Sequence, residues 1–71
     1  MQSIETFRAR LTIAGQSEIA RRVGVTRQAV SLWYQAGRLP YTEYYPKDHE
    51  KRTNYAEAIA KLAKCNRSDL L

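Results

Sequence analysis

Apolar side chains recur at helical spacing in four stretches of the chain. The residues concerned are Ile4, Phe7 and Leu11; Ile19, Ala20 and Val23; Ala29, Val30 and Trp33; and Tyr55, Ala58, Ile59, Leu62 and Ala63. This spacing is typical of amphipathic helices that bury one face against a common core. We therefore predict helices from about residue 4 to 13, 16 to 23, 27 to 36 and 54 to 65.

Polar residues and glycines mark the ends of the first three predicted helices. Ser3 and Thr26 precede the first and third helix, where a side-chain oxygen can accept a hydrogen bond from a backbone N–H two or three residues ahead, for Thr26 that of Gln28 or Ala29. Gly15, Gly24 and Gly37 can end the helices with a positive φ. Only three residues then separate the second and third helices, which predicts a crossing at about 90 to 120°.

The fourth helix has a different set of end signals. Asn54 and Glu57 have the spacing of a capping box, and Asn66 can take the left-handed conformation after the helix. Residues 68–71 can add a short turn, in which Leu70 and Leu71 either close the core or contact a partner.

The sequence of residues 39–54 is compatible with two different structures. Pro46 disfavours helix at Tyr45, and the charged run 47–52 has no apolar face. Alternating aromatics in 41–45 would permit a β-hairpin with residues near 51–55. We favour a long loop with one helical turn near 41–44. The predicted fold is a single all-α domain, residues 1–71, of four to five helices, and the alternative is an α+β domain with a β-hairpin between residues 39 and 54.

The positive charge is concentrated in the N-terminal half. The formal net charge is +5; residues 1–38 carry six arginines against two glutamates (+4), and residues 39–71 carry six basic against five acidic side chains (+1). A clustered positive charge indicates a polyanionic partner. The footprint of that charge coincides with the second and third predicted helices.

Other chemistry is poorly supported by the sequence. A single cysteine, Cys65, cannot form an internal disulfide, and with the single His49 it cannot build a usual zinc site. His49 lies in a polar run without a nucleophile at a suggestive place, so we expect neither an enzyme nor a cofactor, metal or small-molecule ligand. No apolar run approaches the roughly 20 residues that span a bilayer. We expect a cytoplasmic protein.

Residues 16–35 carry a resemblance to a known family. Their motif consists of Gln16, Ile19, Ala20, Val23, Gly24, Val25, Val30 and Trp33. In this order and spacing it resembles the helix-turn-helix of the phage Cro and repressor family of transcriptional regulators. The motif covers 20 of the 71 residues, weaker similarity extends to residues 14–15 and 36–38, and beyond Pro40 it fades.

The resemblance and the stereochemistry of α-helices in the major groove predict the same contact residues. The third helix would place Arg27, Gln28, Ser31 and Leu32 against base edges: arginine and glutamine can bond guanine and adenine in a bidentate manner, and leucine suits a thymine methyl. The predicted contacts to the DNA backbone are Gln16, Thr26, Gln35, Arg8, Arg21 and Arg38, with Arg10 and Arg22 as further phosphate candidates.

The resemblance implies a Cro-like repressor that binds a roughly palindromic double-stranded operator, in the cytoplasm of a bacterial cell as a phage or prophage product. A chain of this size buries only about 60% of its unfolded surface, so stability should be marginal. We expect a weak homodimer that uses the surplus apolar residues Tyr41, Tyr44, Tyr45, Leu70 and Leu71. The alternatives are a recombination directionality factor with a similar motif and an antitoxin-like protein-interaction module.

Overall fold

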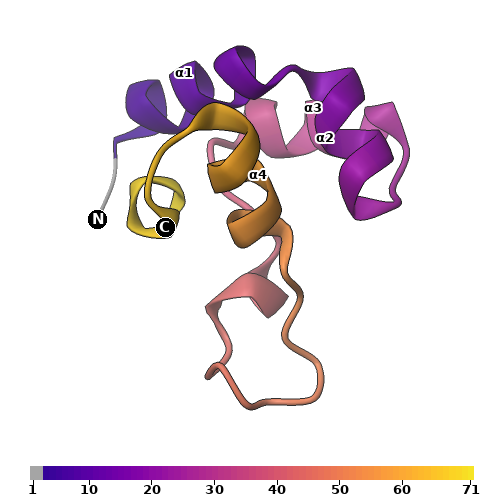
Figure 1. Ribbon diagram of the computed structural model, residues 1–71, viewed down its shortest axis with the longest axis vertical. Coiled ribbons are helices and arrows are strands. Elements are labelled where there is room, and N and C mark those ends of the chain that lie inside the picture. Colours follow the sequence, from indigo (N-terminus) through magenta and orange to yellow (C-terminus); the bar gives the residue numbers. More distant parts are fainter. Residues whose placement is uncertain (1–2) are drawn as a thin grey trace.

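The computed structural model describes residues 3–71 and is helical throughout its regular parts (Figure 1). The elements are α1 (Ile4–Ala14), α2 (Gln16–Val23), α3 (Arg27–Ala36), the 3-10 turn η1 (Tyr41–Tyr44), α4 (Tyr55–Ala63) and the 3-10 turn η2 (Arg67–Leu70). No strand occurs within residues 3–71. The prediction of a small all-α helix-turn-helix domain is confirmed, and the alternative with a β-hairpin is wrong.

The helix ends near the N-terminus form as their residues predict. The Ser3 hydroxyl accepts a hydrogen bond from the backbone N–H of Thr6 at 3.1 Å, and the Thr26 hydroxyl accepts one from the N–H of Ala29, also at 3.1 Å. Gly37 follows α3 in the left-handed conformation, with φ 76°. Each of the two side-chain hydrogen bonds satisfies a backbone N–H group that a helix start would leave unpaired.

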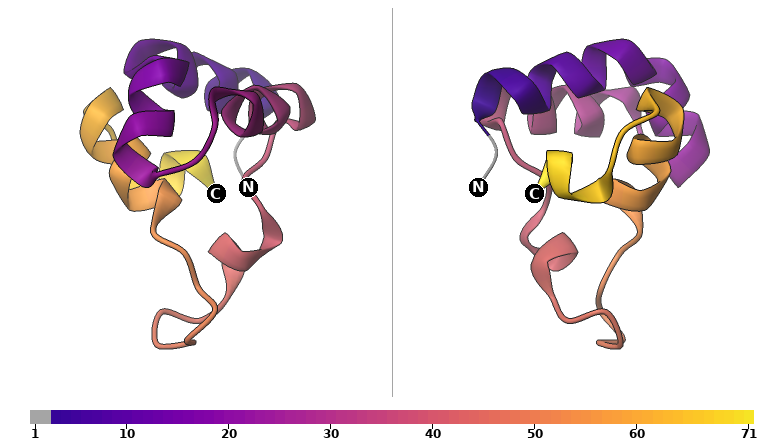
Figure 2. Two further views of the ribbon diagram at one scale, coloured as in Figure 1. Left: turned by 90° about the vertical axis from the view of Figure 1, so that its right-hand side faces the viewer. Right: turned by 60° about the vertical axis from the view of Figure 1, so that its left-hand side comes forward.

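The helices surround one core. Both α4 and η2 pack against α1, and α4 also packs against α2. Figure 2 shows α3 on the side of the molecule away from α4, while residues 45–54 project from the body as a loop. The largest fully buried apolar side chains come from every part of this arrangement: Phe7, Leu11, Ile19, Val30, Leu39, Ile59 and Leu70. This core fixes α3 while its outer face remains free.

The structure buries Leu70 in the core and leaves Ile4 at the surface. Leu70 is only 1% exposed and closes the core, which removes it from the residues available to a dimer. Ile4, predicted on the buried face of the first helix, is 51% exposed, because it lies at the edge of the core against Gly37, which has no side chain to cover it. Trp33 is half-buried against the core and stacks on Tyr55, with ring centroids 4.9 Å apart.

The start of α4 is capped by a residue far away in the sequence. The Asn54 side chain makes no capping hydrogen bond, so the predicted capping box is wrong. Instead Glu43, fully buried in η1, accepts hydrogen bonds from the N–H groups of Tyr55 and Ala56, each at 3.0 Å, and from the Thr53 hydroxyl. The burial of Glu43 is explained by these three donors, which replace water around the carboxylate.

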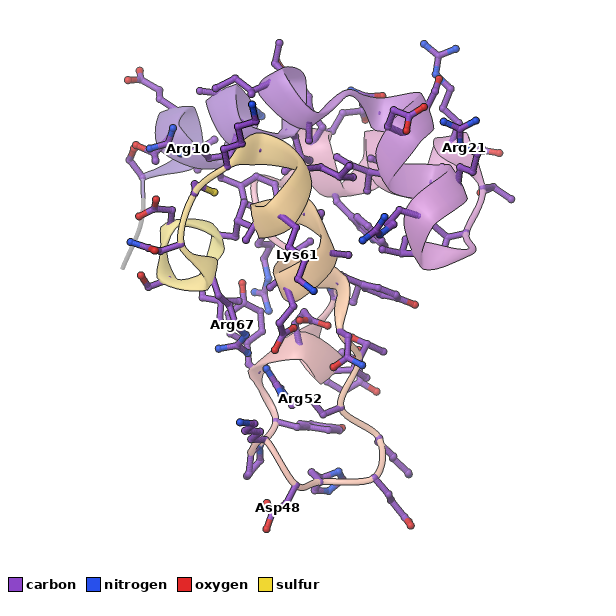
Figure 3. All side chains as sticks on the ribbon, in the orientation of Figure 1. Arg10, Arg21, Asp48, Arg52, Lys61 and Arg67 are labelled. Carbon is purple, nitrogen blue, oxygen red and sulfur yellow. The ribbon has the colours of Figure 1, made fainter. Side chains whose placement is uncertain are left out.

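A cluster of charged side chains connects the projecting loop with α4 and η2. The Glu57 carboxylate on α4 lies 2.5 Å from Arg52 Nη2 and 3.1 Å from Arg67 Nε (Figure 3). Burial acts to raise the pKa of Glu57, but a backbone hydrogen bond and the two guanidinium groups outweigh it and hold that pKa below its usual range. Arg67 also donates to the Glu43 carbonyl at 3.2 Å. These contacts hold the loop ends and η2 beside α4.

The end of α4 also differs from the prediction. Asn66 is extended, with φ −83°, and Lys64 takes the left-handed conformation, with φ 56°. The helix therefore ends two residues earlier than expected, and the backbone N–H of Cys65 donates back to the Ala60 carbonyl at 2.9 Å. This earlier end lets the chain turn so that η2 reaches α1.

Gly24→Val should lower the free energy of unfolding by more than about 1 kcal/mol, because a β-branched residue is strained at positive φ. Gly24 has φ 78°, and a Cβ there would meet no atom within 4 Å, so the loss is expected from the backbone conformation alone. Urea unfolding measures it. Gly24→Asn is the control and should cost less, since asparagine tolerates this region. Equal stability of wild type and Gly24→Val would contradict the left-handed turn.

Candidate nucleic-acid interface

The turn between α2 and α3 fixes how the two helices meet. Gly24 is left-handed, and the backbone N–H groups of Gly24 and Val25 both donate to the Ala20 carbonyl, at 2.9 and 3.0 Å. This pair of bonds ends α2 and reverses the chain within three residues. Ala20 is nearly buried at the approach of the two helices, and Val25 packs half-buried against the core. The small and apolar residues of the motif thus set the position of α3.

The outer face of α3 carries the predicted base-contacting residues together. Arg27 and Gln28 are exposed, Leu32 is 58% exposed and Ser31 is half-buried, whereas Val30 on the other side of the helix is completely buried. Residues at these positions share a face because successive side chains turn by about 100°. The structure therefore brings all four side chains to one solvent-facing surface.

The chain that contains α3 has a long stretch without acidic residues. No acidic residue occurs between Glu18 and Glu43, and Glu43 is buried under its hydrogen bonds. Arg27 lies at the start of α3, where the helix dipole also contributes positive potential. The exposed face of α3 therefore presents cationic and amide groups to an approaching polyanion.

The predicted backbone-contacting residues lie around this face in varied environments. Thr26 and Gln35 are exposed, and Gln16 is half-buried at the start of α2. The Gln35 amide lies 3.5 Å from the Ser31 hydroxyl. The Thr26 hydroxyl is already engaged as the cap of α3. Contacts of these residues with a DNA backbone stay predictions.

Arg21 and Arg38 are exposed but have neighbours. Arg21 bonds Glu18 one turn earlier, and this hydrogen bond, followed by the charge of the guanidinium, holds the pKa of Glu18 below its usual range. Arg38 lies over the Tyr44 ring, 5.7 Å from its centroid. Both contacts are at the surface, where ion pairs are weak, so a phosphate can compete for either arginine.

Arg8 has a structural role that the sequence did not reveal. Its Nε donates to the Tyr34 carbonyl at 2.9 Å and its Nη2 to the Gln35 carbonyl at 2.8 Å, both at the end of α3. The guanidinium also lies over the Tyr34 ring. A cation is favourable at a helix C-terminus, so Arg8 holds α3 to α1, and a phosphate contact by Arg8 stays a prediction.

The two further phosphate candidates, Arg10 and Arg22, lie on different helices and have different neighbours. Arg10 lies 3.6 Å from Asp69, an ion pair between α1 and η2. Arg22 is exposed and lines a shallow hollow of about 310 Å³ between α2 and the start of α4, with Tyr55 and Ala58 on its other side. Arg22 is thus turned toward α4 and away from the outer face of α3, as neighbours on a helix must diverge.

Chemistry of other kinds finds little support in residues 3–71. Within them no three His, Cys, Asp or Glu side chains lie close enough to share a metal ion. The His49 Nδ1 accepts a hydrogen bond from the Lys51 N–H at 3.1 Å, in the exposed loop. Burial raises the pKa of the Cys65 thiol, which makes it a poor nucleophile. The same residues include no helix with the length and apolarity to cross a membrane.

Comparison of this chain with models of protein families, with curated proteins and with solved structures found no match. What the protein does is therefore argued from its own residues and their arrangement.

Proposed function

We propose that this protein is a sequence-specific double-stranded DNA-binding transcriptional regulator, a Cro-like repressor that inserts α3 into the major groove. The observation that carries the proposal is the outer face of α3, which brings together the exposed Arg27, Gln28 and Leu32 and the half-buried Ser31. Arginine and glutamine are the side chains that form bidentate bonds with guanine and adenine. A helix that only supported a core would have no need of this set.

The mechanism needs no separate activity. A helix presented at one side of a small body can enter the groove, which is about 12 Å wide, while the flanking arginines contact phosphates. A protein bound over a promoter would then exclude polymerase sterically. We propose that it acts in the cytoplasm as a weak homodimer on a roughly palindromic operator, without cofactor or small-molecule ligand.

Two other functions have less support. A recombination directionality factor would be favoured by a hairpin wing in residues 39–54, and that segment forms a 3-10 turn and a loop. An antitoxin-like interaction module would use the α4 face, residues 55–63, together with the tyrosine patch. Four of the α4 residues are buried in the core, so that Tyr41 and Tyr44 would supply most of the exposed apolar part of such a surface.

The experiment is selection of bound duplexes from a random pool, followed by mobility-shift titrations with the selected duplex and a scrambled duplex of the same composition. Specific binding should be about 10³-fold or more tighter at fixed salt. Equal affinities for both duplexes would contradict sequence-specific recognition. Absence of binding to either duplex by a folded protein would contradict the proposal altogether and favour the interaction module.

A further inference from the structure

One guanidinium group joins α1 to the end of α3. Arg8 Nε donates a hydrogen bond to the Tyr34 carbonyl at 2.9 Å, and Arg8 Nη2 donates one to the Gln35 carbonyl at 2.8 Å. The guanidinium carbon also lies 5.4 Å from the centroid of the Tyr34 ring. Two of the three guanidinium nitrogens are therefore engaged by the last turn of α3.

The last turn of α3 needs donors from outside the helix. An α-helix leaves its last four carbonyl groups without intrahelical partners, and in α3 these belong to residues 33–36. The Trp33 carbonyl accepts from the backbone N–H groups of Gly37 and Arg38, at 2.9 and 3.3 Å. Arg8 supplies donors to the next two carbonyls, and its positive charge is favourable at the negative end of the helix dipole.

A second contact between the same helix ends lies one turn earlier on α1. Ile4 precedes Arg8 by four residues and shares its face of the helix. A Cβ placed on Gly37 would lie 2.9 Å from Ile4 Cγ1, so the Ile4 side chain lies directly against the residue that ends α3. Figure 2 shows the start of α1 beside this end of α3. An apolar contact and two charge-assisted hydrogen bonds thus connect the two helices.

The core alone gives α3 limited protection against rotation about its own axis. Val30 is completely buried, whereas Trp33 and Tyr34 are half-buried against the core. Within residues 3–71, the two bonds from Arg8 are the only side-chain hydrogen bonds that join α3 to another helix. A rotation of about 15° would move a side-chain tip, about 5 to 6 Å from the axis, by roughly 1.5 Å. Recognition sites tolerate displacements of only about 0.5 Å.

We propose that Arg8 is a positioning residue for base recognition, whose two hydrogen bonds fix the rotation of α3, and that it does not contact a phosphate. Arg27 and Gln28 lie about 10 Å along the helix from the carbonyls that Arg8 binds, so Arg8 acts on them only through α3. A phosphate that drew the guanidinium away would have to break two charge-assisted hydrogen bonds. The inference rests on the proposed function, but the orientation of α3 relative to α1 can be measured without DNA.

Two substitutions separate a positioning role from a phosphate contact. Arg8→Lys keeps the net charge and replaces the planar fork with a single ammonium group, whereas Arg8→Ala removes both. Mobility-shift titrations with the selected and the scrambled duplex, at several salt concentrations, give the affinities and the slope of log K against log salt.

We expect a loss of specific binding with an unchanged salt slope. Binding to the selected duplex should weaken by about tenfold or more in Arg8→Ala and by about fivefold or more in Arg8→Lys. Binding to the scrambled duplex should change by less than about twofold, and the slope by less than about 0.3. A misplaced α3 loses base contacts, whereas the contacts to phosphates remain.

Arg67→Lys is the matched control for a purely structural loss. Arg67 Nε lies 3.1 Å from the Glu57 carboxylate, and Arg67 Nη2 donates to the Glu43 carbonyl at 3.2 Å, so this arginine also joins distant elements, none of which is α3. Thermal melting confirms that each variant is folded at the temperature of the titrations. Arg67→Lys should lower the melting temperature and leave the ratio of selected to scrambled affinity within about twofold of wild type.

Residual dipolar couplings of the backbone N–H bonds measure the orientation of α3 relative to α1 in the free protein. We expect Arg8→Lys to change it by about 10° or more and Arg67→Lys to leave it unchanged. An unchanged orientation in Arg8→Lys and Arg8→Ala would overturn the inference, and so would equal losses on both duplexes. An Arg8→Lys that binds like wild type, with a slope lower by about one in Arg8→Ala, would make Arg8 a phosphate contact. A wild type without sequence preference would overturn the proposed function, with the couplings still deciding whether Arg8 orients α3.

Discussion

Glu43→Ala is expected to lower the free energy of unfolding by about 3 kcal/mol, the largest stability effect that we predict for a polar residue here. The Glu43 carboxylate is fully buried and accepts from the N–H groups of Tyr55 and Ala56 and from Thr53. Removing it leaves buried donors without a partner and the first turn of α4 without a cap. For a domain with a total stability near 5 kcal/mol, the change should be visible in urea unfolding as a large drop in midpoint.

Three further variants make this test specific. Glu50→Ala removes an exposed carboxylate from the same segment and should change stability by less than about 0.5 kcal/mol. Glu43→Gln keeps the shape but turns an NH₂ group toward backbone donors, so it should fall between wild type and Glu43→Ala. If Asn54→Ala were as damaging as Glu43→Ala, the local cap would be the real one, and the account of α4 would be wrong.

Arg27→Ala is expected to weaken binding to the selected duplex by about 1 to 3 kcal/mol and to relax the preference at one base pair. The exposed guanidinium at the start of α3 makes no hydrogen bond or ion pair among the contacts of residues 3–71. Its loss should therefore leave folding intact. Titrations with the selected duplex and with single-base variants of it measure both effects.

Arg21→Ala is the matched control for Arg27→Ala. Arg21 is an exposed arginine on α2, outside the α3 face that we propose to contact bases. If it contacts phosphate, its removal should weaken selected and scrambled duplexes by similar factors and lower the slope of log K against log salt by about one. An Arg27→Ala variant that lost affinity for all sequences equally, with base preferences unchanged, would make Arg27 a backbone contact.

The helices near the motif could be predicted because their signals are local. Ser3, Thr26, Gly24 and Gly37 act on backbone groups within three or four residues of themselves, and each adopts the predicted conformation or bond. The exposed face of α3 follows from helical periodicity once Val30 is known to be buried. These features need no knowledge of the rest of the chain.

The parts that the sequence did not reveal depend on contacts between distant residues. Glu43 stands between Thr42 and Tyr44, in a segment that gives no local sign of a buried carboxylate, and only the approach of residues 53–56 makes it a buried cap. Arg8 reaches α3 across 26 residues of sequence. Periodicity carries no information on such pairs, because it describes one element at a time.

The surplus apolar residues illustrate the same limit. The sequence offered Tyr41, Tyr44, Tyr45, Leu70 and Leu71 as surplus apolar residues, without a way to tell which of them the core would take. The fold buries Leu70 and leaves Tyr41 and Tyr44 exposed, and it sets Ile4 against Gly37 at the end of α3. Which apolar side chains stay exposed becomes visible only when the elements are placed.

The most direct measurement of the central claim is an NMR titration of ¹⁵N-labelled protein with the selected duplex, followed by backbone amide shifts. The account predicts that the largest changes fall on residues 26–32, at the start and outer face of α3, with smaller changes at Gln16. The scrambled duplex should produce weaker changes over the same basic surface. Largest changes on α4, residues 55–63, with α3 unaffected would contradict the account.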